Sequence, residues 1–293
     1  MTVEPVESKT QLRRFRDIPF VLHHDDERWS PGVRAFEQWR TDARRHPYFE
    51  RGDAAFFLAR QGGRPVGRIA AHAPSLDRPR PGGEYTDDGR FGFFDAPDDD
   101  DVVDALVTAA RTWLDEQGRS SMTGPIGWTA EEEFGVLVSG FEHRSRTGRM
   151  WHPEWYAESL RRNGLLAGEE RHSFRLRTGE PTVHRPEVVD EEPPPHAGGF
   201  ADRALVVEGA AAVPDVSATI AGASIRSAWR IARRSRVEGF DTAVCVRCGP
   251  RPQDAVPRLV AAAAAADYEW LLAPWAPDDR TPETTHQVFT SRW

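Results

Sequence analysis

The chain has 293 residues, of which 39% are hydrophobic, including 10 Trp and 15 Phe, and 29% are charged. This composition is sufficient for a buried core and excludes a chain that is disordered throughout. The formal net charge of −8, from 46 acidic and 38 basic residues, has the opposite sign to that of most DNA-binding proteins, so we expect no DNA partner.

The sequence carries no mark of export or of membrane insertion. Its first residues, MTVEPVESKTQLRRF, lack the apolar run of a signal peptide, and no stretch approaches the length of a membrane span. The 2 cysteines are too few for a disulfide framework. We therefore expect a cytoplasmic protein that does not enter a membrane.

The N-terminal part predicts a strand, two helices and a β-hairpin. Residues 2–8 alternate like a strand, Thr10 can cap a helix that Pro19 ends or kinks, and Ser30 precedes a second helix. A hairpin follows, because a Gly-Gly turn separates two strand-like runs, 53–60 and 64–73.

Strands and helices then alternate up to Arg177. The expected elements are a strand at 90–94, a helix at 98–117, a strand at 120–126, a short helix at 130–137, a helix at 155–164 and one or two strands within 166–176. Gly118 and Gly164 stand where glycine commonly ends a helix.

The composition changes after Arg177. Prolines and an acidic cluster mark residues 178–199 as a linker. Beyond it, strands and helices alternate at 203–208, 216–234, 242–246, 252–272 and 287–291 and predict a small βαβαβ module. The chain is therefore predicted to have a mixed α/β (α+β) fold, with a domain of residues 1–177 and a small C-terminal α/β domain of residues 200–293.

Residues 47–176 resemble the GCN5-related N-acetyltransferase (GNAT-like) superfamily of acyl-CoA acyltransferases. The resemblance lies in four segments and in their order: HPYFERGDAAFFLARQGGRPVGRIAA, GRFGFFDAPDDDDVVDALVTAARTWLDEQG, TGPIGWTAEEEFGVLVSGF and HPEWYAESLRRNGL. It implies a central mixed sheet flanked by helices, and it leaves open that residues 200–293 are a truncated second GNAT-like half.

The resemblance implies acyl-CoA, such as acetyl-CoA, as co-substrate. In that superfamily the pantetheine pairs with the central strand and the pyrophosphate binds the N-terminus of the next helix. The residues expected beside it here are Phe93, Phe94, Asp95, Ala96 and Asp101. The loop reads APDDDD, without the family's glycines, so it is a degenerate pyrophosphate loop. Its carboxylates suit a helix N-terminus but repel a pyrophosphate, so CoA either binds in another way or has lost its site.

The resemblance also points to catalytic residues. Tyr156 stands where many GNAT-like enzymes keep the acid that protonates the leaving thiolate, with packing of its helix as the alternative role. Glu132 and Glu133 can take a proton from an amine, although a solvated acidic run that starts a helix explains them equally well. Arginines in a loop can clamp an anionic substrate. The expected substrate-binding residues are Trp128, Arg146 and Arg149.

No metal site is expected. Cys245 and Cys248 have CxxC spacing, but no second pair exists, and side chains three apart on a strand point to opposite faces. His72 and His143 have no partner at metal-binding or catalytic spacing, so structural roles are favoured.

The leading interpretation is an N-acyltransferase that moves an acyl group from a thioester such as acyl-CoA to an amine of a small molecule or protein. Three alternatives stay open: a tRNA-dependent aminoacyltransferase, a non-catalytic binding or partner protein on the same scaffold, and a repurposed GNAT-like enzyme of specialised metabolism. The amine acceptor is the expected partner, and a homodimer stays open.

Overall fold

The structure is a computed structural model. It describes residues 1–29, 34–50, 52–74, 88–130, 132–145, 150–177, 211–213, 218–222, 242–247, 270–273 and 281–293. The predicted linker 178–199 and the predicted strand 203–208 lie outside these residues, as do Arg146, Arg149 and Cys248.

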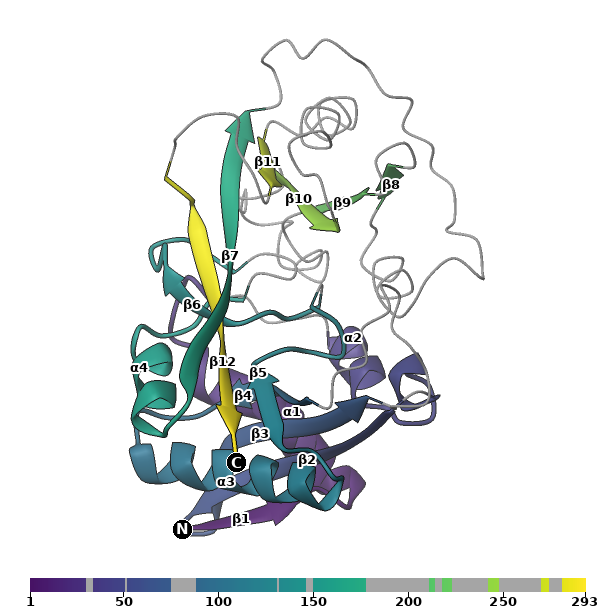
Figure 1. The fold of residues 1–293 in the computed structure, drawn as a ribbon. Helices are drawn as coiled ribbons and strands as arrows, with labels where there is room; N and C mark the ends of the chain where they lie inside the picture. The colour runs from purple at the N-terminus through teal and green to yellow at the C-terminus, as the bar shows by residue number, and fades with distance from the viewer. Residues whose placement is uncertain are drawn as a thin grey trace.

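Helices and strands follow one another in mixed order (Figure 1). In the N-terminal part they are β1 (Thr2–Pro5), α1 (Lys9–His23), α2 (Arg34–Arg40), a 3₁₀ turn (Pro47–Glu50), β2 (Gly52–Gln61), β3 (Arg64–Pro74), β4 (Gly89–Asp95), α3 (Asp100–Glu116), β5 (Ser121–Gly124), β6 (Val136–Ser139), α4 (Trp155–Arg162) and β7 (Leu166–Arg177). The remaining described strands are β8 (Ala211–Val213), β9 (Ala218–Gly222), β10 (Thr242–Arg247), β11 (Trp270–Ala273) and β12 (Thr284–Arg292).

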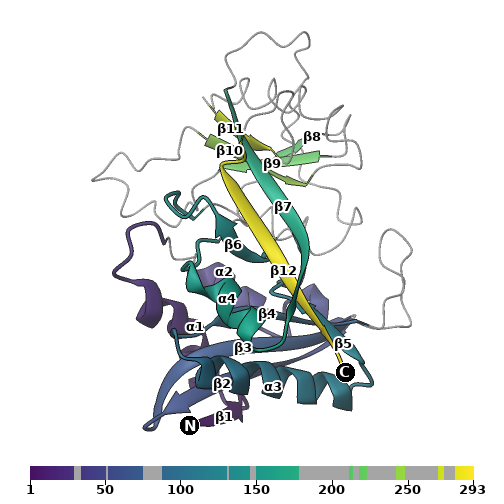
Figure 2. The same cartoon turned by 60° about the vertical axis from the view of Figure 1, so that its left-hand side comes forward.

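One mixed sheet joins these strands in the order β1-β2-β3-β4-β5-β12-β7-β11-β10-β9-β8, with β6 beside β12. The pairs β4–β5 and β10–β11 are parallel, and the other neighbours in this order are antiparallel. Figure 2 shows β7 and β12 as two long strands that run from beside α3 up to the part holding β8 to β11. The mixed sheet flanked by helices confirms the predicted fold class.

The C-terminal strand β12 belongs to the N-terminal part of the sheet. It pairs with β5 and β6 along one edge and with β7 along the other. The last strand of the predicted C-terminal module therefore fills a place between strands of residues 1–177. The rest of the predicted division into domains stays a prediction.

Different helices cover the two faces of the sheet. On β2, Phe57 and Ala59 pack in the same cluster as the apolar face of α3, whereas Leu58 packs with Phe15 and Ile18 of α1. This is the period-two alternation of a strand buried on both sides. Buried residues of α4 join the α3 cluster.

A β-bulge interrupts that alternation on β4. The register against β3 shifts between Gly92 and Asp95, so Phe93 and Phe94 together oppose Ile69. Phe93 has a φ of 50°, in the left-handed region that non-glycine residues rarely adopt. The bulge turns Phe93 into the cluster of α1, while Phe94 stays in the cluster of α3.

Beside the bulge, β4 and the segment that begins with β5 stay in close contact. Their parallel ladder runs through Gly89 and Arg90 and ends there. Farther along, the Ile126 N–H donates to the carbonyl of Phe91 at 2.7 Å. The two backbones come so close that a Cβ on Gly92 would lie 2.1 Å from the carbonyl oxygen of Ile126.

We expect Gly92→Ala to lower the free energy of unfolding by at least about 2 kcal/mol, because its methyl group collides with backbone that cannot move aside cheaply. Gly63→Ala is the matched control, since it adds the same methyl group at a φ of 78° with no atom within 4 Å. That variant should lose about 1 kcal/mol through its backbone conformation alone. Urea unfolding measures both, and equal losses would contradict the close approach at Gly92.

The N-terminal helix differs from its prediction at both ends. Ser8, and not Thr10, is the N-cap: its hydroxyl accepts from the N–H of Gln11, whose side-chain oxygen accepts from the Ser8 N–H. This reciprocal capping box outcompetes a lone threonine. Pro19 lies inside the helix without ending it.

Three predicted helices were wrong wholly or in part, because strand pairing overrides helical spacing. The segment predicted as a helix at 130–137 holds no helix in its described residues, and β6 begins at Val136 and pairs with β12. Strand β9 lies within the predicted helix 216–234, and β11 overlaps the end of the predicted helix 252–272. Both strands pair with β10.

Candidate functional site

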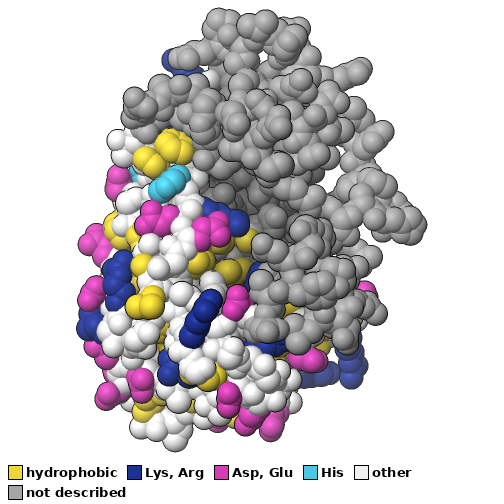
Figure 3. Space-filling view, viewed as in Figure 1, with side chains coloured by type: hydrophobic (Ala, Val, Ile, Leu, Met, Phe, Trp, Pro, Cys, Tyr) yellow, Lys and Arg dark blue, Asp and Glu magenta, His cyan; other side chains and the backbone are white. Residues whose placement is uncertain are grey.

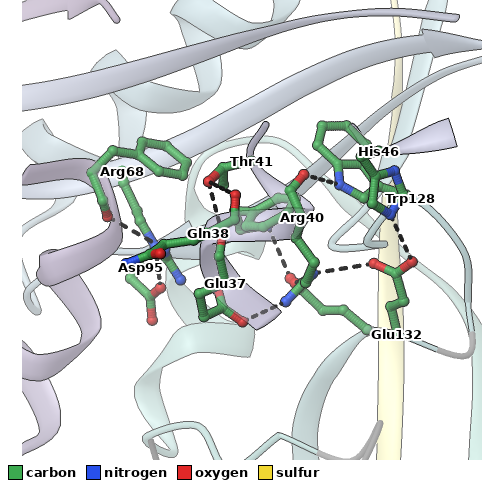
Figure 4. A network of polar contacts seen from close by, with 12 residues as sticks. Glu37, Gln38, Arg40, Thr41, His46, Arg68, Asp95, Trp128 and Glu132 are labelled. Carbon is green, nitrogen blue, oxygen red and sulfur yellow. Dashed lines mark hydrogen bonds and ion pairs between the residues drawn. The ribbon is translucent and has the colours of Figure 1, made fainter. Parts of the chain in front are cut away.

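Two networks of charged and polar side chains contact β4. Figure 4 labels Arg40 and Glu132 of one and Arg68 and Asp95 of the other. We call them the Arg40 network (Glu37, Arg40, His46, Glu132 and Glu133) and the Asp95 network (His23, Arg68, Asp95 and Tyr156). The first joins the end of α2 to the loop between β5 and β6, and the second joins α1, β3, β4 and α4.

In the Arg40 network, three carboxylates surround one guanidinium. Arg40 Nε lies 3.1 Å from Glu132 Oε2, Nη2 lies 3.2 Å from Glu133 Oε2, and Nη1 lies 3.0 Å from Glu37 Oε1. The other Glu132 oxygen faces His46 Nε2 at 3.6 Å. Because the Glu132 side chain is 2% exposed and that of Glu133 10%, the interpretation of these residues as a solvated acidic run was wrong.

The charges in this network shift one another's protonation. Burial lowers the pKa of Arg40, but the carboxylates of Glu37, Glu132 and Glu133 outweigh it and hold that pKa above its ordinary value. Burial raises the pKa of Glu133 despite the attraction of Arg40 and Arg68.

Glu133 also holds the bulge. Its Oε1 accepts a hydrogen bond of 3.0 Å from the backbone N–H of Phe93, the residue with positive φ. One carboxylate therefore ties the left-handed residue of β4 to the buried guanidinium of Arg40. Both oxygens of Glu133, which the sequence suggested as a base, serve contacts within the protein.

The Asp95 network begins with a cross-strand pair. Arg68 and Asp95 are register partners on β3 and β4, and Arg68 Nε donates to Asp95 Oδ2 at 2.7 Å. His23, the last residue of α1, places Nε2 3.1 Å from Asp95 Oδ1. Burial raises the pKa of Asp95, but the charge of Arg68 and the contact with His23 outweigh it and bring the pKa to about 2.

Tyr156 of α4 completes this network. Its Oη lies 3.3 Å from both the backbone nitrogen of Ala96 and His23 Nε2, and 3.5 Å from Asp95 Oδ1. The ring is fully buried against Phe94 at 5.4 Å between ring centres. Burial, with the nearby charge of Asp95, raises the pKa of Tyr156 well above its ordinary value, so the hydroxyl keeps its proton.

The depressed pKa of Asp95 predicts a pH-dependent contribution to stability. An aspartate with a pKa near 2 in the folded state and about 3.9 unfolded contributes about 2–3 kcal/mol at pH 7, and this is lost as the pH falls toward 2. Asp95→Asn should therefore be less stable than the parent by about that amount at pH 7, with the difference shrinking between pH 4 and 2.

Urea unfolding at several pH values measures this difference. Asp25→Asn is the control, because the Asp25 side chain is 92% exposed, and its unfolding should match the parent throughout. A gap between Asp95→Asn and the parent that is independent of pH would contradict the depressed pKa.

Carboxylates of the chain itself bind the backbone and side chains around the first turn of α3. Asp99 is the N-cap, and its Oδ1 accepts from the N–H groups of Asp101 and Val102 at 3.0 and 3.4 Å. Asp100 is held by Arg162 at 2.8 and 2.9 Å and by the Ser159 hydroxyl at 3.0 Å. These contacts couple the first turn of α3 to α4.

The structure brings some predicted site residues together and separates others. Phe94, Asp95 and Ala96, at the bulge and end of β4, contact Tyr156, whereas Phe93 packs in the cluster of α1. Trp128 lies in the aromatic cluster under α1, with its ring stacked on Tyr48 at 4.5 Å and its Nε1 donating to the Arg40 carbonyl. Its side chain is buried there, and its predicted role in binding substrate stays a prediction.

The histidines singled out from the sequence have different settings. His72 is buried, with Nδ1 3.1 Å from the Tyr48 hydroxyl and Nε2 3.0 Å from the Ile126 carbonyl oxygen. These contacts favour the structural role expected of it. His143 lies beside Glu142, with a side chain that is 32% exposed.

Sequence reasoning missed His23, Arg40 and Arg68. Arg68 had a visible signal, because it is a charge inside an otherwise apolar strand run, GRIAAHA. His23 and Arg40 end helices, and nothing in their spacing shows which distant carboxylates they meet.

Within the described ranges, no three His, Cys, Asp or Glu side chains come together as a metal-binding group. None of the helices described is both long enough and apolar enough to cross a membrane.

No family model matches the chain. It is 38% identical over 145 residues to a bacterial ceramide synthase of Caulobacter vibrioides, a match that covers 48% of this chain and 36% of the relative. It is 32% identical over 161 residues to Protein YghO of Escherichia coli, covering 55% of this chain and 40% of the relative. The match spans less than half the length of either curated relative.

Solved structures with the same fold are remote in sequence. The tandem GNAT protein of the clavulanic acid biosynthesis pathway superposes with a TM-score of 0.56 at 13% identity, covering 99% of this chain and 98% of that one. A GCN5-related glucosamine N-acetyltransferase region of a fungal multi-domain protein gives 0.54 at 12% identity, covering 99% and 38%. The chain therefore has a GNAT-like fold, the fold of acyltransferases.

Proposed function

We propose that the protein transfers an acyl group from a thioester to an amine. The observation that supports this best is the position of Tyr156 Oη, 3.3 Å from the backbone nitrogen of Ala96, just past the end of β4. In the reaction the amine nitrogen bonds to the thioester carbonyl carbon and releases a proton to solvent water, the carbon–sulfur bond breaks, and the sulfur gains a proton. A neutral hydroxyl at this place is suited to protonate the sulfur.

The Asp95 network is suited to return that proton. His23 Nε2 lies within 3.3 Å of Tyr156 Oη and 3.1 Å of Asp95 Oδ1, so a proton on the imidazole has a direct path to the phenolate. Arg68 keeps Asp95 ionised, so its carboxylate is a hydrogen-bond acceptor beside His23 Nε2. In this proposal Tyr156 is the acid, and His23 and Asp95 are positioning residues.

The bulge supplies a donor for the thioester carbonyl. Phe93 and Phe94 fall in the register shift, outside the paired positions of the ladder to β3. Glu133 takes the N–H of Phe93, so we assign the polarising role to the N–H of Phe94 or Asp95. Glu133 then acts by fixing the bulge and not by removing the amine's proton.

A lipid amine is the acceptor that the name of one sequence relative favours. A ceramide is the amide of a fatty acid and a long-chain amino alcohol, and the relative from Caulobacter vibrioides is a ceramide synthase by name. We propose an amino alcohol of this class as acceptor and a fatty acyl thioester as donor. The fold is equally suited to an acetyl donor such as acetyl-CoA.

The alternatives have weaker support. A tRNA-dependent enzyme needs a basic surface for the nucleic acid. On the described surface seen in Figure 3, acidic and basic side chains are interspersed, and the net charge is −8. A role in specialised metabolism draws only on the similarity in fold to the clavulanic acid pathway protein.

Incubation of the full chain with acyl thioesters and a panel of amines tests the proposal. We expect a new amide by mass spectrometry together with an equal amount of free thiol, highest with a long-chain amino alcohol. Thiol release without amide would identify a hydrolase, and neither product with any pair would refute acyl transfer. Retention of charged tRNA at low salt would favour the tRNA-dependent alternative.

A further inference from the structure

The backbone N–H groups in the first turn of α3 determine whether the diphosphate of an acyl donor can bind there. A diphosphate at a helix start is bound by backbone N–H groups that have no other partner, aided by the helix dipole. Here the N–H groups of Asp101 and Val102 donate to Asp99 Oδ1, and the Asp99 N–H donates to the Pro97 carbonyl at 2.8 Å. Three of the N–H groups at this helix start are therefore already engaged.

The closing carboxylate is itself held in place. Asp99 Oδ2 lies 3.4 Å from Gln61 Nε2, which comes from the tip of the β2–β3 hairpin. The nearby cation is also engaged: Arg162 binds Asp100 through two hydrogen bonds and lies 3.8 Å from Asp98. A diphosphate would meet four consecutive aspartates, with this arginine already paired. The residues present do not fit the diphosphate of CoA.

We infer that the protein recognises its acyl donor by the acyl-pantetheine arm alone, with no contribution from a nucleotide diphosphate at α3. The donor class is therefore acyl-pantetheine thioesters. The pantetheine arm can come from CoA or from a carrier protein, and the two sources share the chemistry that is recognised. This inference rests on the proposed acyl transfer.

The test compares three donors with the same acyl chain: S-acyl-pantetheine, acyl-CoA and the acyl carrier protein thioester. We expect kcat/KM for S-acyl-pantetheine and acyl-CoA to agree within about threefold, and calorimetric Kd values for pantetheine and CoA to agree likewise. A preference for CoA above about 30-fold in either measurement would overturn the inference. A carrier-protein thioester that reacts faster than both supports the inference and identifies the source.

Failure of the proposed function looks different. If no donor yields amide, acyl transfer is refuted, while the two Kd values still decide whether the diphosphate is recognised. Failure of both pantetheine and CoA to bind at millimolar concentration would overturn the inference as well.

A variant reopens the helix start. Glycine is well tolerated at an N-cap, and Asp99→Gly frees the N–H of Asp101 while removing one negative charge. The N–H of Val102 keeps its bond to the backbone carbonyl of residue 99. The variant should tighten CoA binding about fivefold or more and leave pantetheine binding unchanged. Asp115→Asn, which removes a charge at the far end of α3, should change neither Kd. An unchanged Kd for CoA in Asp99→Gly would count against the closing role of Asp99.

Discussion

Replacing Arg40 by methionine is expected to lower the free energy of unfolding by about 3–5 kcal/mol at pH 7, because it removes the cation shared by three carboxylates. The side chains of Arg40 and Glu132 are 6% and 2% exposed, so water cannot replace the guanidinium. Urea unfolding of the parent and the variant measures the loss.

The deficit of this variant should depend on pH. Burial already raises the pKa of Glu133, and removing Arg40 raises it further. A carboxyl whose pKa is higher folded than unfolded favours the folded state at low pH and loses that contribution as the pH rises through the folded pKa. The gap between the parent and Arg40→Met should therefore be smaller at pH 5 than at pH 8.

Arg34→Met is the matched control for this substitution. Its side chain is 67% exposed and pairs with Asp17 at 3.2 Å, so its loss should stay below about 1 kcal/mol. If Arg40→Met also lowered the free energy of unfolding by less than about 1 kcal/mol, the three carboxylates would have found other partners. The Arg40 network would then not be what holds the bulge through Glu133.

Local patterns were sufficient to predict much of the sheet. The Gly62-Gly63 turn, with alternating residues on both sides, predicted the hairpin of β2 and β3, and Gly118 marked the end of α3. These signals depend on neighbours in sequence. The place of β12 between β5 and β7 depends on pairing with strands more than a hundred residues away, and no local pattern encodes that choice.

The contacts of the candidate site residues were not predictable from the sequence. The resemblance pointed to Tyr156 and to the end of β4, which the fold does bring together. The run FGFFD contains no pattern that predicts the bulge. The positive φ of Phe93 depends on a hydrogen bond from its N–H to Glu133, which lies in a different loop. Which arginine meets which carboxylate is likewise settled only by tertiary packing.

Replacing Tyr156 by phenylalanine is expected to lower kcat for acyl transfer by about 10²–10⁴-fold with little change in KM. The substitution keeps the ring against Phe94 and His152 and removes only the hydroxyl. The Ala96 N–H loses its partner, which should cost about 1–2 kcal/mol of stability. Burial raises the pKa of Tyr156, so its hydroxyl stays protonated at alkaline pH. The parent should therefore keep its activity above the pH at which an ordinary tyrosine ionises.

Tyr48→Phe separates loss of catalysis from loss of stability. Tyr48 is also buried, and its hydroxyl bonds to His72 in the cluster under α1, away from the Asp95 network. Its stability should fall by a similar amount, while kcat changes by less than about threefold. Equal losses of kcat in the two variants would show that Tyr156 acts through packing.

The leaving group provides a test that a structural role would not pass. An aryl thiolate leaves without being protonated, whereas the thiolate of an alkyl thioester needs an acid. If Tyr156 donates that proton, Tyr156→Phe should regain most of its lost rate with an aryl thioester, and Tyr48→Phe should respond like the parent. A defect of the same size with both thioesters would place the acid elsewhere, and it would leave the hydroxyl of Tyr156 with the single role of holding the Ala96 N–H.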